Sequence, residues 1–486
     1  MTSKLVQASK LHTARTENGA VAHQSTLSRI VDLYQLAGSS RNHVSNISDA
    51  FLFALREDKD LAVRIMLHAR DVRQGMGERS VGRKMLELSI KHLSDEDNLR
   101  IMRKVPEMGR WDDMLVYFGT KYQAEAFHMI LAGLDNPQTA SLVAKWLPRE
   151  KKGNKQFVHA FCKFSGLTRI EYRKLCSQLS NTVEQKICAK DFSEINFSQV
   201  PSVASARYQK LFHKHDGVRY REWIEQLTKP VEERPKDVKI NAGAVYPYNV
   251  LISSRRGDAN VAQAQWDALP DYLDGSDENV LCMADVSGSM TTERFGDVNA
   301  LDIGVSLTMY CAQRNHGIFK DQAMIYSTNP FFVELTGSLR DRERQMMAHV
   351  EYGSTDLQKA FDLILQTAVK HNLDEKDMPT KVIIFSDMEF NSVCRSGSVD
   401  RWGGGGNLTN FEAITKKFAQ AGYEAPQIVF WHLASRAKKA QATVNDKGVA
   451  IVSGFSPAIL KAVLGGSDLT PMGVILKAVA ITRYDW

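Results

Sequence analysis

From residue 279 onward, short apolar runs alternate with amphipathic segments, and this alternation narrows the folds open to the chain. Such apolar runs predict buried strands, whereas apolar residues at three- and four-residue spacing predict helices. We therefore expect strands at residues 279–287, 322–327, 330–336, 381–387, 426–434 and 448–454. Helices are expected at residues 297–313, 354–371, 410–422 and 456–466. This alternation predicts an α/β doubly wound domain, with a six-stranded, mostly parallel sheet covered by helices on both faces.

Five residues with oxygen-bearing side chains lie at the strand-to-helix turns of this half. Asp285, Ser287 and Ser289 form the motif D-V-S-G-S after the first expected strand, Thr355 precedes a long helix, and Asp387 ends another strand. Because the carboxyl ends of parallel strands share one edge of a sheet, we expect these side chains to meet there. Carboxylate and hydroxyl oxygens suit a small, hard cation, so the sequence predicts Mg²⁺ or another divalent cation. The alternative is that these residues only cap helices and fill turns.

Residues 21–274 have a helical texture instead. Apolar residues recur at three- and four-residue spacing, and strand-like runs are scarce. Helices joined by short polar connections are typical of helical repeats, including those of the HEAT type. We therefore predict a multidomain chain with an irregular lead-in at residues 1–20, an all-α helical-repeat domain at 21–274 and the α/β domain at 275–486.

The composition is that of a globular protein without a membrane segment. Of 486 residues, 43% are hydrophobic and 24% charged, and the net charge of +6 permits an anionic partner. No apolar stretch approaches the roughly 18 residues that a membrane span needs, and the N-terminus lacks the apolar core of a signal peptide. The six cysteines form no C-x-x-C pair and are expected to be free thiols. We expect a cytoplasmic protein with no membrane partner.

The most basic part of the helical half lies between residues 145 and 174. Only Glu150 and Glu171 oppose its cations, and aromatic residues are interleaved with them. The nine cations are Lys145, Arg149, Lys151, Lys152, Lys155, Lys163, Arg169, Arg173 and Lys174. Cations mixed with aromatics suit single-stranded RNA, because phosphates meet the charge while bases stack on the rings. The alternative is a solvated helix face above core aromatics.

Four segments of the helical half carry a family resemblance. They are residues 61–79 (LAVRIMLHARDVRQGMGER), 105–115 (VPEMGRWDDML), 144–157 (AKWLPREKKGNKQF) and 195–212 (INFSQVPSVASARYQKLF). Together with the α/β half, they resemble the Ro (TROVE-module) RNA-binding autoantigens, and more closely an uncharacterised bacterial and phage branch related to Ro. The resemblance extends from about residue 18 to the end of the chain.

This resemblance carries expectations for each half. In Ro proteins, helical repeats form a ring that a von Willebrand factor A domain closes; the hole takes single-stranded RNA ends and the basic outer face holds structured RNA. The five oxygen ligands resemble the metal-ion-dependent adhesion site of such A domains. By that resemblance Ser287, Ser289 and Thr355 supply hydroxyls, and Asp285 and Asp387 bind directly or through water. One metal position then stays open for an acidic residue of a protein partner.

Several further motifs have less specific interpretations. Residues 70–79 carry three arginines beside Asp71 and Glu78, and we favour an internal ion-pair network joining helices over a phosphate cradle. Asp112 and Asp113 are interpreted as helix-capping residues. The glycines at 403–406 lack the Lys-Ser/Thr of a phosphate loop and are expected in a surface loop. D-V-S-G-S is not the G-x-S-x-G elbow of hydrolases, and no nucleophile–base pair emerges, so we predict no enzymatic activity.

Two hypotheses follow. The leading one is a Ro-like RNA-binding protein, a ribonucleoprotein component whose helical ring grips single-stranded or structured small RNA. Its Mg-binding A domain would close the ring or dock a partner. The alternative is a metal-dependent protein-interaction adaptor without RNA binding, because A domains with a metal site also serve as docking modules.

Overall fold

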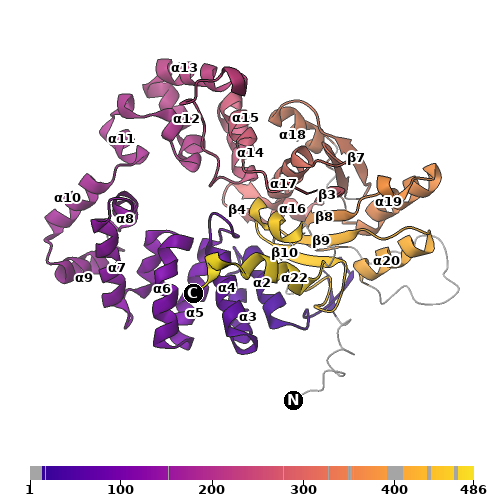
Figure 1. Ribbon diagram of the computed structural model, residues 1–486, viewed down its shortest axis with the longest axis horizontal. Helices are drawn as coiled ribbons and strands as arrows, with labels where there is room; N and C mark the ends of the chain where they lie inside the picture. The colour runs from indigo at the N-terminus through magenta and orange to yellow at the C-terminus, as the bar shows by residue number, and fades with distance from the viewer. Residues whose placement is uncertain are drawn as a thin grey trace.

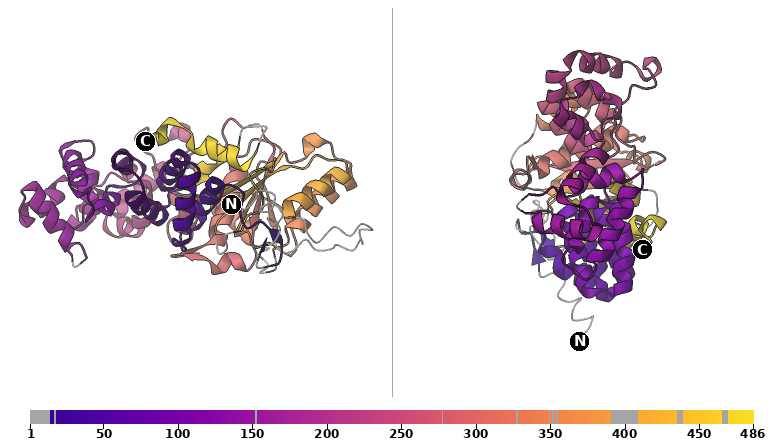
Figure 2. Two further views of the ribbon diagram at one scale, coloured as in Figure 1. Left: turned by 90° about the horizontal axis from the view of Figure 1, so that it is seen from below. Right: turned by 90° about the vertical axis from the view of Figure 1, so that its left-hand side faces the viewer.

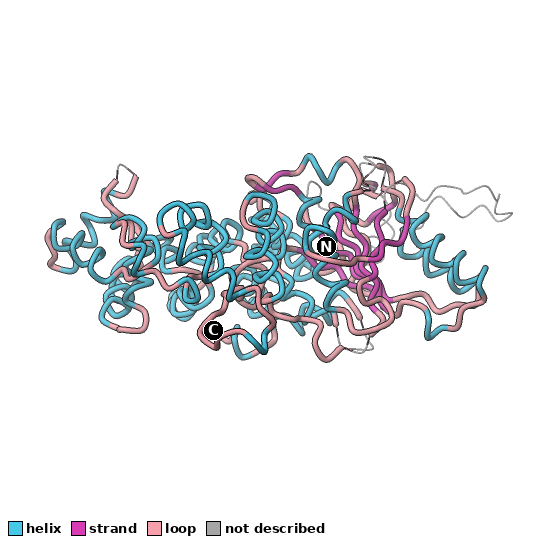
Figure 3. Tube along the Cα trace, turned by 90° about the horizontal axis from the view of Figure 1, so that it is seen from above, coloured by secondary structure: helices cyan, strands magenta, loops and turns pink. Residues whose placement is uncertain are grey.

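The chain folds into a curved helical arm and a second unit built on one β-sheet (Figure 1). The computed structural model describes residues 14–16, 18–151, 153–276, 278–326, 328–348, 350, 353, 355–390, 409–434, 439–464 and 469–486. The arm extends to one side of the sheet (Figure 2), and the strands gather in the other part of the molecule (Figure 3). The expected division into a helical N-terminal half and a C-terminal half with a mixed sheet is confirmed.

The larger sheet of the described residues has six strands in the order β10-β9-β8-β3-β6-β7. The strands are β3 (Val280–Asp285), β6 (Gln322–Tyr326), β7 (Phe331–Glu334), β8 (Lys381–Ser386), β9 (Gln427–His432) and β10 (Val449–Ser453). Neighbouring strands run parallel except for β6 and β7, which are antiparallel. The predicted six-stranded, mostly parallel sheet is therefore confirmed. Two small hairpins also occur, β1 (Ala14–Arg15) with β2 (Val21–Ala22) and β4 (Arg294–Phe295) with β5 (Val298–Asn299).

Helices cover both faces of this sheet because successive side chains of a strand point to opposite sides. In β3, Cys282 and Ala284 belong to the core shared with α2, α17 and α22, whereas Leu281 and Met283 face α19 and α20. The helices of this unit are α16 (Ser289–Thr292), α17 (Ala300–Arg314), α18 (Leu339–Met347), α19 (Leu357–His371), α20 (Asn410–Gln420), α21 (Leu460–Val463) and α22 (Pro471–Val479). The helix expected at residues 456–466 is a 3-10 turn, η7 (Pro457–Ile459), followed by the short α21.

The arm consists of helices whose consecutive members pack in pairs, such as α2 with α3 and α14 with α15. They are α2 (Arg29–Ser39), α3 (Asn46–Glu57), α4 (Lys59–Arg70), α5 (Arg79–His92), α6 (Asp95–Met108), α7 (Gln123–Asp135), α8 (Ala140–Trp146), α9 (Lys155–Ser165), α10 (Arg169–Leu179), α11 (Val183–Ala189), α12 (Ser202–His215), α13 (Gly217–Leu227), α14 (Pro247–Arg256) and α15 (Ala259–Asp267). Its short 3-10 turns are η2 (Trp111–Tyr117), η3 (Phe192–Glu194), η4 (Phe197–Gln199) and η5 (Val231–Glu233), whereas η6 (Glu375–Asp377) and η8 (Thr482–Tyr484) belong to the C-terminal half. Because α2 packs on β10 and α14 packs on α17, the arm leaves the sheet unit and returns to it (Figure 1).

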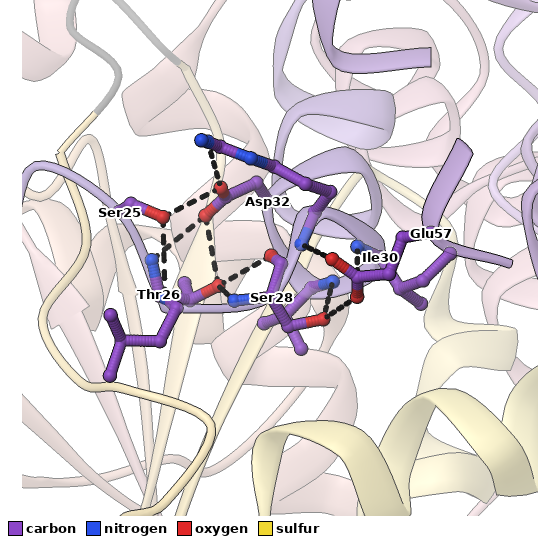
Figure 4. Close-up of polar contacts among 9 residues, drawn as sticks. Ser25, Thr26, Ser28, Ile30, Asp32 and Glu57 are labelled. Atoms are coloured by element: carbon purple, nitrogen blue, oxygen red, sulfur yellow. Dashed lines mark hydrogen bonds and ion pairs between the residues drawn. The ribbon is translucent and has the colours of Figure 1, made fainter. Parts of the chain in front are cut away.

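Hydrogen bonds fix the start of α2, which is the first helix on the sheet (Figure 4). Ser28 Oγ donates to Glu57 Oε1 at the end of α3 over 2.7 Å. The carboxylate of Asp32 accepts from Ser25 Oγ at 2.9 Å and from Thr26 Oγ1 at 2.8 Å. These bonds orient α2 and thereby set where the arm begins on the sheet.

The last residues of the chain bind the first helices of the arm. The Arg483 guanidinium contacts the Asp71 carboxylate at 2.5 Å, and Tyr484 Oη donates to the same carboxylate at 3.0 Å. Trp486 Nε1 donates to Asp60 Oδ1 over 3.0 Å. The C-terminus therefore joins the sheet unit to α4, as its position in Figure 1 shows.

Four further predictions concern the domain boundary, the N-terminal lead-in, membrane-spanning helices and the cysteines. The division near residue 274 stays a prediction, and β3 begins at Val280. Within the predicted lead-in at residues 1–20, residues 14 and 15 pair with 21 and 22. Among the described residues, no helix combines the length and apolar character needed to cross a membrane. The cysteines in this part of the chain are free thiols, whereas Cys394 and the glycines at 403–406 lie outside the described residues.

Candidate functional site

Two strands at the middle of the sheet bring the predicted metal ligands to one edge. From β3 the chain continues to β6 and β7 on one side, and the later strands β8, β9 and β10 lie on the other. β3 and β8 are thus parallel neighbours at the point where the strand order reverses, which is where open α/β sheets bind ligands. Asp285 ends β3, and Asp387 directly follows β8.

The Asp285 side chain is fully buried and held from both sides. Its Oδ1 accepts a hydrogen bond from the backbone N–H of Ser287 at 2.9 Å, and its Oδ2 accepts one from Ser386 Oγ at 2.6 Å. Ser386 Oγ in turn accepts from the Met388 backbone N–H at 2.9 Å. Ser386 was not among the predicted site residues, although its position beside Asp387 in the run IIFSD was the available signal.

The hydroxyl ligands come from two loops that contact each other. Ser287 and Ser289 occupy the tight turn before and at the start of α16, and their Oγ atoms are 3.1 Å apart. The Gly288 backbone N–H donates to the Gly353 carbonyl over 3.5 Å, which joins this turn to the loop that carries Thr355. Thr355 Oγ1 is buried and makes no hydrogen bond to any residue in the described part of the chain. A buried hydroxyl of this kind suits a ligand that coordinates it.

Electrostatics at this edge favour a cation. Burial, aided by the neighbouring Asp387 carboxylate, raises the pKa of Asp285 to about 7. A divalent cation between two such carboxylates offsets their repulsion. Among the described residues, no group of three or more His, Cys, Asp and Glu side chains is arranged to hold a metal. In the described part of the chain, the oxygen atoms gathered at this edge include the serine and threonine hydroxyls beside Asp285 and Asp387.

The predicted RNA-binding cations differ in exposure and in their partners. Arg149 is turned inward and donates to the carbonyls of Ala144 and Leu147 at 3.0 and 3.1 Å. Lys145 pairs with Glu184 at 3.0 Å. The exposed cations are Lys151, Lys155, Lys163, Arg169, Arg173 and Lys174. Lys152 lies outside the described residues.

The aromatic residues interleaved with these cations mostly belong to the core of the arm. Phe157, Phe161 and Tyr172 are buried, and the rings of Phe157 and Phe161 both contact Phe127. Phe164 is 37% exposed, but its ring also lies 5.3 Å from that of Phe127. The buried rings therefore support helix packing, and the expectation that the interleaved aromatics offer stacking platforms is wrong for them.

The interpretation of residues 70–79 as an ion-pair network is confirmed, and the capping role is confirmed for Asp113, whereas Asp112 instead contacts arginine side chains. Arg70 contacts Asp113 at 2.6 Å, and Arg79 contacts Asp112 at 2.6 Å. Asp113 Oδ2 also accepts from the Arg110 backbone N–H at 2.9 Å, as a capping residue does. The segment is an ion-pair network that joins α4, α5 and η2.

Comparisons of the sequence with known proteins find matches over both halves of the chain. Two family models match, the domain of unknown function DUF2828 over residues 164–277 and the domain of unknown function DUF7788 over residues 279–473. An uncharacterized protein of Acanthamoeba polyphaga mimivirus is 27% identical over 518 residues, which cover 96% of this chain and 86% of that protein.

A solved structure extends the comparison to the fold. The crystal structure of the Deinococcus radiodurans RO (RSR) protein matches with a TM-score of 0.51 at 13% sequence identity. The match covers 94% of this chain and 100% of that one. The chain therefore has a Ro-like fold over nearly its whole length.

Proposed function

We propose that this chain is a Ro-like RNA-binding protein whose helical arm holds single-stranded or structured small RNA. The observation that carries the proposal is the set of exposed cations on α9 and α10, within an arm that has the Ro-like fold. Lys155 on α9, Lys174 on α10 and Lys151 before α9 are exposed, and Glu150 and Glu171 are the only acidic residues between positions 145 and 174. Phosphate contacts of this kind supply most sequence-independent affinity for RNA.

The distribution of charge along the chain supports the same surface. Residues 145–239 contain 20 Lys and Arg and 11 Asp and Glu, a net charge of +9. The whole chain carries only +6, so the remainder has a net charge of −3. A local positive field on the far part of the arm attracts a polyanion even though the protein as a whole is only mildly basic.

We further propose that the sheet unit is a von Willebrand factor A-type domain that binds Mg²⁺ or another divalent cation. Asp285, Ser287, Ser289, Thr355 and Asp387 would hold the ion, and Ser386 orients Asp285 toward it. The buried Thr355 hydroxyl and the adjacent carboxylates fit such an ion. When bound, it supplies a positive centre that a carboxylate of a protein partner contacts. In this arrangement the domain closes the helical arm and docks a partner.

Charge reversal on the arm tests RNA binding. We expect the variant Lys151→Glu, Lys155→Glu, Lys174→Glu to bind a single-stranded RNA at least about tenfold more weakly than the parent. Its log–log salt dependence should also flatten by roughly 0.7 for each phosphate that the variant no longer neutralises. The matched control is Lys370→Glu, Lys376→Glu, Lys416→Glu, which makes the same change in net charge at exposed positions of the sheet unit. Fluorescence anisotropy at two salt concentrations measures both quantities.

The same experiment separates the RNA-binding proposal from its rival. Equal affinities of the arm variant and its control would contradict an RNA face on α9 and α10. A protein that binds no RNA and yet captures an acidic protein partner only in the presence of Mg²⁺ would instead be the metal-dependent adaptor.

A further inference from the structure

Three guanidinium groups converge on one carboxylate oxygen in the first half of the arm. Arg79 and Arg110 each contact Asp112 Oδ2 at 2.6 Å, and Arg83 contacts the same atom at 3.2 Å. Arg79 and Arg83 lie on α5, whereas Arg110 directly precedes η2. Residues from two separate elements thus bring three cations to a single point.

A second carboxylate leaves the cluster with surplus positive charge. Asp113 is only 2% exposed and contacts Arg70 at 2.6 Å and Arg83 at 2.5 Å. Four arginines therefore face two aspartates, which leaves a charge of +2. The Arg70–Asp113 and Arg83–Asp113 pairs already join α4 and α5 to η2, so this packing role does not account for Arg79 and Arg110.

The surplus cations reach solvent. The side chains of Arg79, Arg83 and Arg110 are 45%, 25% and 26% exposed. Burial lowers the pKa of Arg79, Asp112 opposes this effect, and the adjacent Arg83 and Arg110 lower the pKa further. Each guanidinium has five N–H donors, of which the contacts to Asp112 and Asp113 occupy a minority.

The cluster is also held in place before any ligand arrives. The Arg110 guanidinium lies 3.7 Å from the centre of the Trp146 ring, which fixes its plane. A Cβ atom at Gly109 would come within 2.3 Å of Asp113 Oδ2 and 2.9 Å of Arg70, so a larger residue at this position would displace the Arg70–Asp113 pair. Preorganised, planar donors of this kind match the oxygens of a phosphate group.

We propose that Arg79, Arg83 and Arg110 form a binding site for a phosphate monoester, with the terminal phosphate of an RNA strand as its source. A phosphate monoester carries about −1.5 to −2 at neutral pH and matches the surplus of +2, whereas an internal phosphodiester carries only one negative charge. The site is separate from the cations of α9 and α10. The choice of RNA as the source rests on the proposed RNA-binding function, whereas the phosphate chemistry does not.

The experiment compares full-length protein with three versions of one short single-stranded RNA: 5′-phosphorylated, 3′-phosphorylated, and hydroxyl at both ends. We expect one phosphorylated version to bind about tenfold tighter than the hydroxyl version, as charge-assisted hydrogen bonds to a dianion imply. Inorganic phosphate alone, titrated by calorimetry, forms the second arm. It is expected to bind weakly at the same cluster.

Variants locate the effect. Arg79→Gln, at the most exposed of the three arginines, should abolish the preference for the phosphorylated RNA and leave affinity for the hydroxyl RNA unchanged. Arg100→Gln is the matched control, because Arg100 is an exposed arginine on the adjacent α6 that pairs only with Glu96 among the described residues. Equal melting temperatures of the two variants exclude a folding defect, and Arg79→Lys is measured in its place if Arg79→Gln melts lower.

The possible outcomes distinguish the phosphate-binding site from the RNA-binding function. Tight binding of hydroxyl RNA with no gain from either phosphate overturns the phosphate site and leaves the RNA-binding function standing. Failure of every RNA to bind, with inorganic phosphate still bound in an Arg79-dependent way, retains the site and removes RNA as its source. Absence of both kinds of binding overturns the site.

Discussion

The edge of the sheet and the basic stretch of the arm differ in how the position of residues in the sequence relates to their position in the structure. The predicted metal ligands are spread between residues 285 and 387, yet three loops bring them to one edge beside β3 and β8. The predicted RNA-binding cations lie within residues 145–174, yet they differ in exposure and pairing. Arg149 points inward, and Lys145 is paired with Glu184.

Physical reasons explain this contrast. Parallel strands place all their carboxyl ends on one edge of the sheet. Residues that follow these strands therefore lie close together even when they are far apart in the sequence. Helices distribute neighbouring residues around an axis with 3.6 residues per turn, so cations near one another in sequence face in several directions. A constellation spaced across alternating strands and helices is thus a stronger guide to a site than a local run of charge.

The largest expected effect is at the sheet edge. Asp387→Ala should weaken Mg²⁺ binding at least about 100-fold, because it removes a charged ligand while leaving the strand pairing of β8 intact. Isothermal titration calorimetry measures the change. Asp374→Ala, at a carboxylate that is 72% exposed, is the control and should bind Mg²⁺ as the parent does. If Asp387→Ala binds Mg²⁺ normally, the convergence at this edge serves packing and not a metal.

The sequence predicted the strands of the sheet and most of the candidate metal ligands, but not every residue of the site. The strands of the sheet followed from apolar runs bounded by turns, and Asp285 and Asp387 followed from their positions at strand ends. The role of Ser386 did not, because its hydroxyl acts on Asp285 across two strands that are distant in sequence. Pairing of this kind depends on register, which the sequence pattern alone leaves open.

The arm was harder to predict for a related reason. Apolar spacing identified its helices, but the aromatic residues between residues 145 and 174 gave no sign of which faces they occupy. Phe161 and Phe164 are three positions apart on α9 and lie near one another, yet one is buried and the other 37% exposed. Which cations have internal partners depends on helices such as α11, whose Glu184 contacts Lys145. These contacts are tertiary and are not encoded in the local run of charge.

A second prediction concerns the stability of the sheet edge in the absence of metal. Burial, aided by Asp387, raises the pKa of Asp285 from 3.8 to about 7. The folded state therefore binds an extra proton between about pH 4 and pH 7, and stability contributed by Asp285 falls as the pH rises through that range. A pKa difference of one between the folded and unfolded states corresponds to about 1.4 kcal/mol. The free energy of unfolding that Asp285 contributes therefore falls by at most about 4 kcal/mol.

The variant Asp285→Asn isolates this contribution. Urea unfolding with a chelator present, at pH 5 and pH 8, should show that the parent loses more stability between the two values than the variant does. The difference between the proteins is the quantity of interest, because His68 and His432 have pKa values lowered by burial and shift both proteins equally in the opposite direction. If the free energy of unfolding had the same pH dependence in parent and variant, the surroundings of Asp285 would not raise its pKa.

The smallest expected effect concerns the exposed aromatic of the arm. Phe164 is the candidate for base stacking, because its ring reaches solvent while Phe157, Phe161 and Tyr172 are buried. Its ring, however, already contacts those of Phe127 and His128, with centroids at 5.3 and 4.8 Å. Phe164→Ala should therefore change RNA affinity less than about threefold and leave the salt dependence as in the parent. A stacked base is worth about 1–3 kcal/mol, so a loss of tenfold or more, measured by anisotropy at one salt concentration, would establish Phe164 as a stacking platform. It would also show that the basic stretch combines charge and stacking although most of its rings are buried, and so would weaken the contrast with the sheet edge.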